Sequence, residues 1–373
     1  MFINWELTES LNDRRCLLFI VLIIFVLDLV SCGSPKPPKK GIIKGEDILS
    51  KTLFYQTDMN EITHITQGLL DKHPGLDIGI CSFEGMYIID PSKGSLKSKV
   101  EFSRRWGIEA IHIDKDGDYE IALYDHNGTV GLLGMNGSPL WTHKFSEKGK
   151  VNSIASGDLD RNGELEFYVA TYDGLYQLNT SGRILWKKGD TAYDVAIFNP
   201  GGSKDPLVVA RCPQSILRGI HYLQFRDYRG ELIKEVKPKV DIMGIEFVQW
   251  PLQWNMVTRN RNIYILDLEG NVVLKDKIGY AIFDNRATTV RFFDDQDPYL
   301  AVVGRLSSRY HRAILCIYAP DGKVFYKEII GKTTGLLAKK SPHSKCETLL
   351  VGDGPGKVYE YKHRLKKGEI EKQ

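Results

Sequence analysis

The chain has 373 residues, of which 42% are hydrophobic and 26% are charged. This balance supplies enough apolar surface for a sizeable core and excludes an intrinsically disordered protein. The formal net charge of +3 is too small to indicate nucleic-acid binding, and neither a basic helix nor a zinc-ligand spacing supports it. We therefore expect no nucleic-acid partner.

An apolar segment near the N-terminus indicates export. Arg14 and Arg15 precede an apolar run over residues 17–27, and residues 29–32 read Leu-Val-Ser-Cys. The run is shorter than the roughly 20 apolar residues that span a bilayer comfortably, and its length suits the core of a signal peptide. The segment resembles a bacterial lipobox, which implies cleavage before Cys32 and a diacylglyceryl group on the Cys32 sulfur.

Three features follow from this resemblance. Residues 1–31 would be a lipoprotein signal peptide, and residues 32–45 would form a Pro/Lys-rich tether that holds the protein to a membrane by its lipid. Gly33 stands where an aspartate is associated with retention in the inner membrane, so the expected location is the outer membrane of a bacterial envelope. Asp28, at the end of the apolar segment, leaves an uncleaved signal anchor as the alternative.

The rest of the chain repeats one pattern seven times. An apolar strand is followed by a polar loop, a second apolar strand, a third strand and a turn with glycine. Successive turn glycines, from Gly94 to Gly322, are 40 to 52 residues apart, which is typical of propeller blades. The second strands are the clearest and are expected at residues 77–81, 120–124, 166–170, 206–210, 254–258, 299–303 and 348–352.

The pattern predicts an all-β fold, a seven-bladed β-propeller over residues 46–364, followed by a charged C-terminal tail over residues 365–373. The last copy lacks a fourth strand, and an unassigned strand-like segment, residues 47–56, precedes the first copy. We expect this N-terminal strand to complete the last blade and to close the ring without an exposed edge.

The loop over residues 158–166 has the composition of a calcium loop. Oxygen-bearing side chains occupy its positions 1, 3, 5 and 9, and glycine stands at position 6, where a sharp bend is needed. The spacing predicts side-chain ligands Asp158, Asp160, Asn162 and Glu166, and a main-chain oxygen from Glu164. An ordinary polar turn is the alternative.

The calcium-loop pattern resembles the FG-GAP or VCBS repeat, which is found in the integrin α head and in exported bacterial proteins. The preceding copy aligns in register, with His112 in place of the first acid and the further candidate ligands Asp114, Asp116, Asp118 and Glu120. Because histidine is a poor calcium ligand, this loop is either a weak site or a turn held by hydrogen bonds. The resemblance implies a propeller that uses Ca²⁺ structurally.

Charged residues are segregated among the loops between second and third strands, which share one face of a propeller. The basic group is Arg211 and Arg218 in copy four, Arg259 and Arg261 in copy five, and Arg305, Arg309, His311 and Arg312 in copy six. The other copies carry Glu84, Asp125, Asp173 and Asp353. Arginine pairs well with carboxylate and phosphate, so we expect an anionic partner at the basic sector, either a protein or an envelope glycan.

No catalytic motif accompanies the repeats. The sequence has no His-x-x-x-His pair, no nucleophile elbow and no obvious cluster of paired acids outside the metal loops. The favoured function is therefore a non-catalytic binding or scaffold module tethered to the bacterial envelope. The alternative is a propeller enzyme acting on an envelope or extracellular glycan, because propellers host such activities as well.

Overall fold

The computed structural model divides into two units, residues 1–38 and residues 39–373. The first unit, with the predicted signal segment and Cys32, lies outside the described residues. The described residues are 41–45, 47–68, 77–101, 107–112, 119–125, 127–134, 136–145, 150–189, 191–202, 204–215, 220–259, 262–278, 280, 282–293, 296–306, 311–341 and 344–364. None of them belongs to a helix long and apolar enough to cross a membrane.

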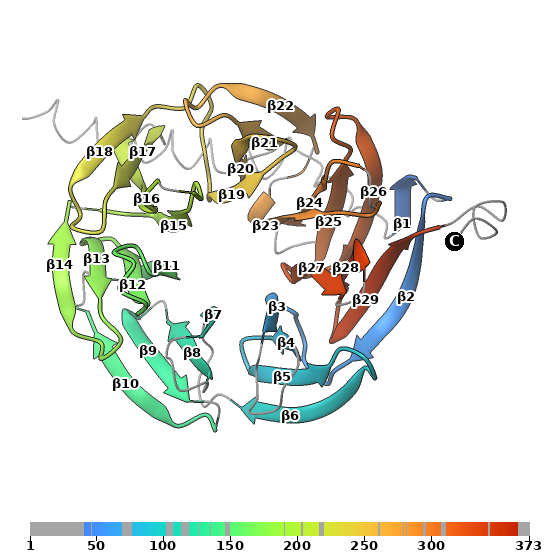
Figure 1. Cartoon of the computed structure of the whole chain (residues 1–373), viewed down its shortest axis with the longest axis horizontal. Helices are drawn as coiled ribbons and strands as arrows, with labels where there is room; N and C mark the ends of the chain where they lie inside the picture. The colour runs from blue at the N-terminus through green and yellow to red at the C-terminus, as the bar shows by residue number, and fades with distance from the viewer. Residues whose placement is uncertain are drawn as a thin grey trace, which may run out of the picture. The chain divides into compact units, whose positions relative to one another are not determined.

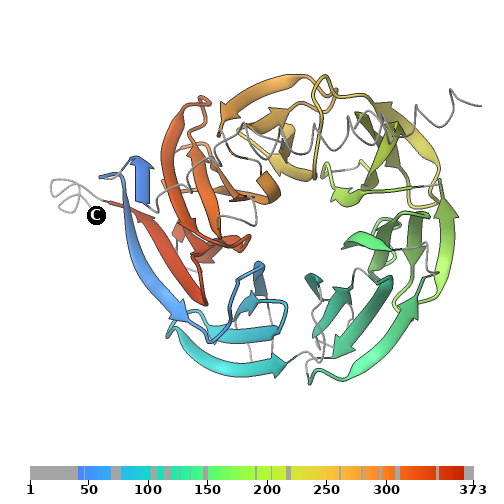
Figure 2. The same cartoon turned by 180° about the vertical axis from the view of Figure 1, so that it is seen from behind.

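The second unit is a ring of seven antiparallel sheets, which confirms the predicted seven-bladed β-propeller (Figures 1 and 2). Blades one to three contain β3 (His64–Gly68), β4 (Asp77–Cys81), β5 (Gly85–Asp90) and β6 (Ser95–Glu101); β7 (Gly107–His112), β8 (Tyr119–Tyr124), β9 (Thr129–Gly134) and β10 (Pro139–Lys144); and β11 (Val151–Gly157), β12 (Glu166–Thr171), β13 (Gly174–Leu178) and β14 (Ile184–Lys188). Blades four and five contain β15 (Asp194–Phe198), β16 (Leu207–Ser215), β17 (Ile220–Arg226) and β18 (Leu232–Val236); and β19 (Glu246–Gln249), β20 (Trp254–Arg259), β21 (Asn262–Leu266) and β22 (Val272–Lys277).

Blades six and seven use strands from both ends of the unit. Blade six contains β23 (Ile282–Val290), β24 (Tyr299–Leu306), β25 (Arg312–Tyr318), β26 (Val324–Gly331) and, on its outer edge, β1 (Gly41–Lys44). Blade seven contains β27 (Leu336–Ser341), β28 (Ser344–Gly352), β29 (Lys357–His363) and, as its outer strand, β2 (Leu49–Gln56). The strands nearest the axis of the ring are β3, β7, β11, β15, β19, β23 and β27, which are called first strands below, and the outer strands form the rim (Figure 1).

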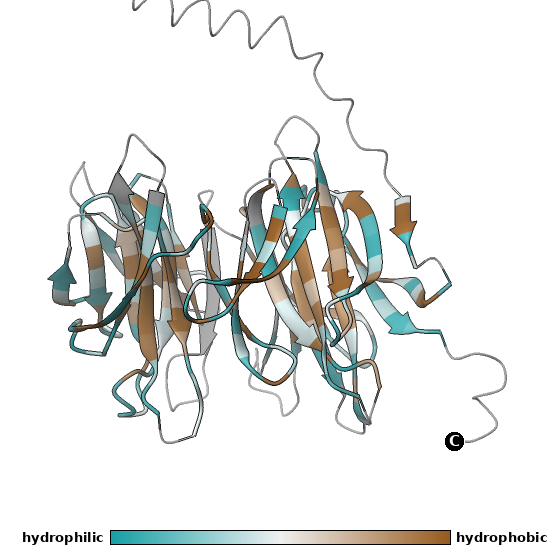
Figure 3. Cartoon of the chain, turned by 90° about the horizontal axis from the view of Figure 1, so that it is seen from above, coloured by the Kyte–Doolittle hydropathy of each residue, from teal (hydrophilic) through white to brown (hydrophobic). Residues whose placement is uncertain are grey.

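The hydrophobic core is divided among the contacts between neighbouring blades. Seven buried clusters fill these contacts, one for each pair of adjacent blades. All residues of β4 and of β12 are buried because both faces of a middle strand pack against another blade, which explains their continuous apolar sequences. Viewed from the edge, hydrophobic segments are concentrated in strands within the blades, and other strands are partly hydrophilic (Figure 3).

Outer-strand tryptophans join neighbouring blades. Trp141 Nε1 donates a hydrogen bond to Thr180 O in the next blade at 2.7 Å, and Trp186 Nε1 donates one to Tyr228 O at 3.0 Å. A Cβ at Gly182, which has a φ of +77°, would lie 2.6 Å from the Trp141 ring. Only glycine fits this turn, because it accepts both the left-handed backbone and the close indole.

The N-terminal strand closes the ring as predicted. β2 pairs with β29 in antiparallel register, from Leu49 opposite His363 to Gln56 opposite Lys357. Residues 41–44, which the sequence pattern placed in the tether, form β1 and pair with β26, with Gly41 opposite Ile329. The paired structure therefore begins before the predicted boundary at residue 46. The cysteines at 81, 212, 316 and 346 form no disulfide bond with one another.

A buried ion cluster fastens the closing strand. Lys51 Nζ on β2 lies 2.8 Å from Glu328 Oε1 and 3.0 Å from Asp353 Oδ2, and these two acidic side chains are only 5% and 2% exposed. Tyr326 and Tyr361 donate hydrogen bonds to the second oxygen of Glu328. Burial opposes the charge on Lys51, but its contacts with Glu328 and Asp353 outweigh burial and raise its pKa above the usual value.

Replacing Lys51 tests the closure. Lys51→Met should lower the free energy of unfolding by about 3–5 kcal/mol, because two buried carboxylates would lose their cation. The measurement is denaturant unfolding near pH 7. The matched control is Lys323→Met, because Lys323 is 83% exposed and, within the described residues, pairs only with the exposed Asp321 in a turn of blade six. The control should stay within about 1 kcal/mol of wild type. Equal stability of the two variants would contradict the proposed role of Lys51.

Candidate cation site and basic axial cavity

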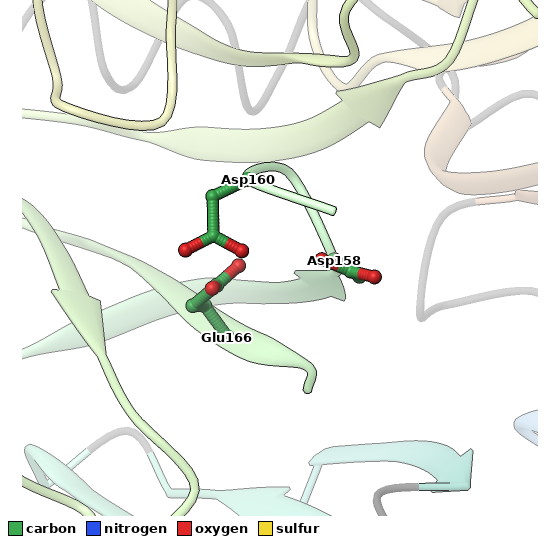
Figure 4. A group of neighbouring side chains, drawn as sticks. All are labelled: Asp158, Asp160 and Glu166. Atoms are coloured by element: carbon green, nitrogen blue, oxygen red, sulfur yellow. The ribbon is translucent and has the colours of Figure 1, made fainter. Parts of the chain in front are cut away.

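Three of the predicted metal ligands lie together in the loop between β11 and β12. Asp158, Asp160 and Glu166 each offer a carboxylate oxygen, and these oxygens lie within 4.8 Å of one another. Figure 4 shows the carboxylates of Asp160 and Glu166 turned toward each other across the loop. No other group of three or more His, Cys, Asp or Glu side chains in the described part of the chain has this spacing.

Hydrogen bonds within the loop explain its conformation. Asp160 Oδ1 accepts a bond from Asn162 N at 3.0 Å, and Asn162 Oδ1 accepts one from Glu164 N at 2.6 Å. Asp158 Oδ2 accepts a bond from Gly163 N at 3.0 Å, and the φ of +88° at Gly163 makes the bend possible. The side chains of Asn162 and Glu164, the other two predicted ligand residues, are exposed.

The carboxylates repel one another in this loop. Burial, followed by the charges of Asp160 and Asp158, raises the pKa of Glu166 to about 7, against the lowering effect of bonds from Leu159 N and the Tyr168 hydroxyl. Glu166 is 5% exposed. A divalent cation bound among the three carboxylates would offset both the repulsion and the burial.

The residues present fit a calcium ion. Asp158 Oδ1 is buried and accepts no hydrogen bond within the described residues. A buried acceptor without a donor is costly, and an oxygen-seeking cation would satisfy it. When bound, calcium would be held by Asp158, Asp160 and Glu166, and its chemistry there would be structural.

Most of the second predicted metal loop lies outside the described residues. Asp114, Asp116 and Asp118 are not described, so their predicted role as ligands stays a prediction. Glu120 lies in β8, is buried, and occupies the position in blade two that Glu166 occupies in blade three. This agrees with the register that the sequence pattern assigned to the two loops.

A cavity of about 500 Å³ lies along the axis, bordered mainly by the first strands of blades three to six. Its lining includes the guanidinium-bearing residues Arg211, Arg286 and Arg305 and the acids Asp194 and Glu246. Arg211 lies on β16 opposite Asp194, and Arg305 lies on β24 opposite Asp284. Arg211 and Arg305 were expected in loops of the basic sector of blades four to six, but both lie within second strands, from which they border the cavity.

Two of these arginines have ion-pair partners. Arg305 Nη1 lies 3.3 Å from Glu61 Oε1, and Lys332 Nζ lies 2.5 Å from the other oxygen of Glu61. Arg286 Nη1 lies 3.0 Å from Glu246 Oε1. Arg211 packs instead over the ring of Tyr193, with its guanidinium carbon 5.3 Å from the ring centroid.

The structure describes only part of the predicted basic sector. Arg218, Arg261 and Arg309 lie outside the described residues, and at Arg259 only the backbone at the end of β20 is described. Arg312 begins β25 and donates a hydrogen bond to His311 O at 3.1 Å. Sequence reasoning missed Arg286 because it lies on a first strand, where no loop marks it. The signal that could have found it is strand alternation, since first strands line the axis.

The fold and these two features define a class: a seven-bladed β-propeller with a candidate cation loop and a basic axial cavity. No protein-family model and no curated protein matches the chain. The fold is shared with the BBS1 N-terminal region crystallised in complex with ARL6 and soaked with mercury, at 12% identity and a TM-score of 0.57, covering 83% of this chain and 94% of that one. The lead-soaked form gives 13% identity, the same TM-score and the same coverage.

The biofilm matrix protein Bap1 of V. cholerae is similar at 11% identity and a TM-score of 0.54, over 85% of this chain and 91% of that one. At these identities the likeness shows the propeller fold alone. The FG-GAP or VCBS resemblance of the metal loop remains a prediction.

Calcium should stabilise the folded chain. Binding to the folded state alone adds about 2.7 kcal/mol at a hundredfold excess over Kd. Thermal unfolding in calcium and in chelator should therefore differ for wild type, and Asp160→Ala should abolish the difference. Asp297→Ala is the matched control, because Asp297 is an exposed acid in the equivalent loop of blade six. A calcium shift that Asp160→Ala leaves intact would refute the site.

The pH dependence of Glu166→Gln supplies a second readout. The pKa of Glu166 is raised from 4.5 to about 7, so the charged carboxylate destabilises the calcium-free fold progressively between these pH values and fully above them. In chelator at pH 8, Glu166→Gln should therefore be more stable than wild type, by an amount on the order of 2 kcal/mol. The gain should vanish near pH 4. In calcium, wild type should be more stable than Glu166→Gln, because the variant has lost a carboxylate ligand.

Proposed function

We propose that this chain is a non-catalytic binding module tethered to a bacterial envelope by lipidated Cys32, most favourably at the outer membrane, with calcium stabilising blade three. The observation that carries the binding role is the axial cavity, where Arg211, Arg286 and Arg305 gather from blades four and six. The partner is an anionic group, either on a protein surface or on an envelope glycan.

The similar BBS1 structure contains a bound protein, ARL6, which supports protein binding as a use of this fold. The cation loop joins a first strand to a second strand, so it lies on the face opposite the loops between second and third strands. A calcium ion there would stabilise the blade without contacting the partner. The clustering of Asp158, Asp160 and Glu166 supports the resemblance to FG-GAP or VCBS repeats.

An enzyme acting on a glycan is the second candidate, and the acids of the cavity argue against it. Asp194 accepts hydrogen bonds from Val195 N and Ile245 N, both at 3.0 Å. Glu246 pairs with Arg286. A glycosidase needs two carboxyl groups available to the substrate, one as an acid and one as a base or nucleophile. These two acids are already engaged in holding the cavity wall.

Lipidation has a direct test. Mass spectrometry of the mature chain purified from membranes should show an N-terminus at Cys32 that carries acyl chains. Cys32→Ala should move the protein out of the detergent phase in a two-phase extraction, while Cys346→Ala, which changes a partly exposed cysteine of the propeller, should leave it there. A mature chain that begins at Met1, or an unmodified Cys32, would refute the anchor.

Charge reversal tests the partner face. The variant should leave Arg305 unchanged, because its reversal would place a second acid beside buried Glu61. The substitutions are Arg259→Glu, Arg309→Glu and Arg312→Glu. We expect at least a tenfold loss of the proteins or glycans that wild type captures from an envelope extract, and a weaker salt dependence.

The matched control reverses three cations in turns between third and fourth strands, which lie on the opposite face: Arg183→Glu, Arg229→Glu and Lys323→Glu. Its capture should equal that of wild type. Equal loss of capture in both variants would assign the effect to net charge and contradict binding at the basic sector. No loss of capture in either variant would contradict it as well.

A further inference from the structure

Arg211 differs from the other arginines of the axial cavity because it has no ionic partner. Within the described residues its side chain makes no ion pair or hydrogen bond, and its Nε is buried without an acceptor. The nearest register partner, Asp194, uses both carboxylate oxygens to accept backbone N–H groups. Arg286 and Arg305, in contrast, are both paired.

Aromatic neighbours hold the Arg211 guanidinium in place but do not accept hydrogen bonds from its N–H groups. Arg211 lies over the Tyr193 ring, and Tyr193 in turn packs against Tyr172 and His221, with ring centroids 5.6 and 5.5 Å apart. Burial lowers the pKa of Arg211 while the charges of Asp194 and Asp241 raise it, so the group remains a cation at neutral pH. A positioned cation with unused donors is an anion-binding group.

We propose that the axial cavity binds a small polar molecule through a single carboxylate at Arg211. This rests on the proposed function, in which the axis of blades four to six receives an anionic group. A carboxylate carries one charge and presents two oxygens in a plane, which matches one guanidinium fork. A phosphate dianion would leave a charge unbalanced, because Arg211 is the one unpaired cation among the described cavity residues and Asp194 lies beside it.

The other residues that line the cavity favour a ligand that carries hydroxyl groups besides its carboxylate. Asn152, Ser153 and Ser156 of β11 and Thr63 border the cavity with hydrogen-bonding groups. Asn152 Nδ2 is held by Ala192 O at 2.9 Å, and this leaves its side-chain oxygen as an acceptor for a ligand hydroxyl. A volume of about 500 Å³ suits one small molecule. A sugar acid has both the carboxylate and the hydroxyls.

Isothermal titration of the mature chain with glucuronate, glucose and glucose 6-phosphate tests the proposal. Glucuronate should bind, and glucose and glucose 6-phosphate should bind at least about tenfold more weakly. Arg211→Gln should weaken glucuronate binding by about tenfold or more, and Arg211→Lys should retain part of it, because lysine keeps the charge without the fork. Arg229→Gln, an exposed arginine in a turn of blade four, is the matched control and should bind as wild type does.

Unfolding curves distinguish a lost contact from a lost fold. Arg211→Gln should melt no lower than wild type in the absence of ligand, since it removes an unpaired cation, and glucuronate should raise the melting temperature of wild type and of Arg229→Gln but not that of Arg211→Gln. Three results would overturn the proposal: no glucuronate binding at millimolar concentrations, equal binding of glucose, or unchanged binding by Arg211→Gln. If these occur while the charge-reversed loops still abolish capture from the extract, the carboxylate site fails and the proposed function stands.

Discussion

Closure of the last blade by β2 is the constraint on which the ring depends, and Lys51 is the residue of that strand that carries charge into the buried contact between blades six and seven. This lysine, from the first segment of the propeller, supplies the cation for Glu328 of blade six and Asp353 of blade seven. Leu49 of the same strand enters the hydrophobic cluster between these blades. Because every core cluster lies between two blades, opening one contact exposes two blade faces at once. The ion cluster thus joins the ends of the chain where the ring has no covalent continuity.

Closure also determines where functional groups lie. Seven first strands face one axis, so residues from blades far apart in sequence, such as Asn152 and Arg305, border the same cavity. Successive strands of a blade run in opposite directions, and this separates the loops onto two faces. Loops that join first to second strands lie at one end of each blade, and loops that join second to third strands lie at the other. The acidic loop at residues 158–166 and the end of β16 near Arg211 therefore belong to opposite faces, which suits a structural role for one and a binding role for the other.

The sequence predicts those parts of the structure that depend on local pattern. The buried second strands and the turn glycines, such as Gly182, follow from continuous apolar runs and from left-handed turns. The role of residues 47–56 follows from counting strands. The sequence did not predict β1, because four residues are too few to show a periodicity and because its pairing partner, the strand that contains Ile329, lies near the other end of the propeller in sequence. The burial of Glu166 and the missing partner of Arg211 depend on side chains from other elements, which no local spacing encodes.

The axial cavity and the cation loop are connected by β11, so calcium binding at the loop would affect ligand binding in the cavity as well as stability. Residues 152–156 of β11 border the axial cavity, and Asp158 follows the end of β11 at Gly157. A calcium ion held by Asp158 and by Glu166 of β12 would fix the end of β11 to its neighbour, because the ion bonds to both strands' flanking residues. The wall that presents Asn152 and Ser153 would then lose less conformational entropy when a ligand binds. Calcium and an axial ligand would therefore bind with positive coupling although they occupy opposite faces, since by linkage each must strengthen the other by the same factor.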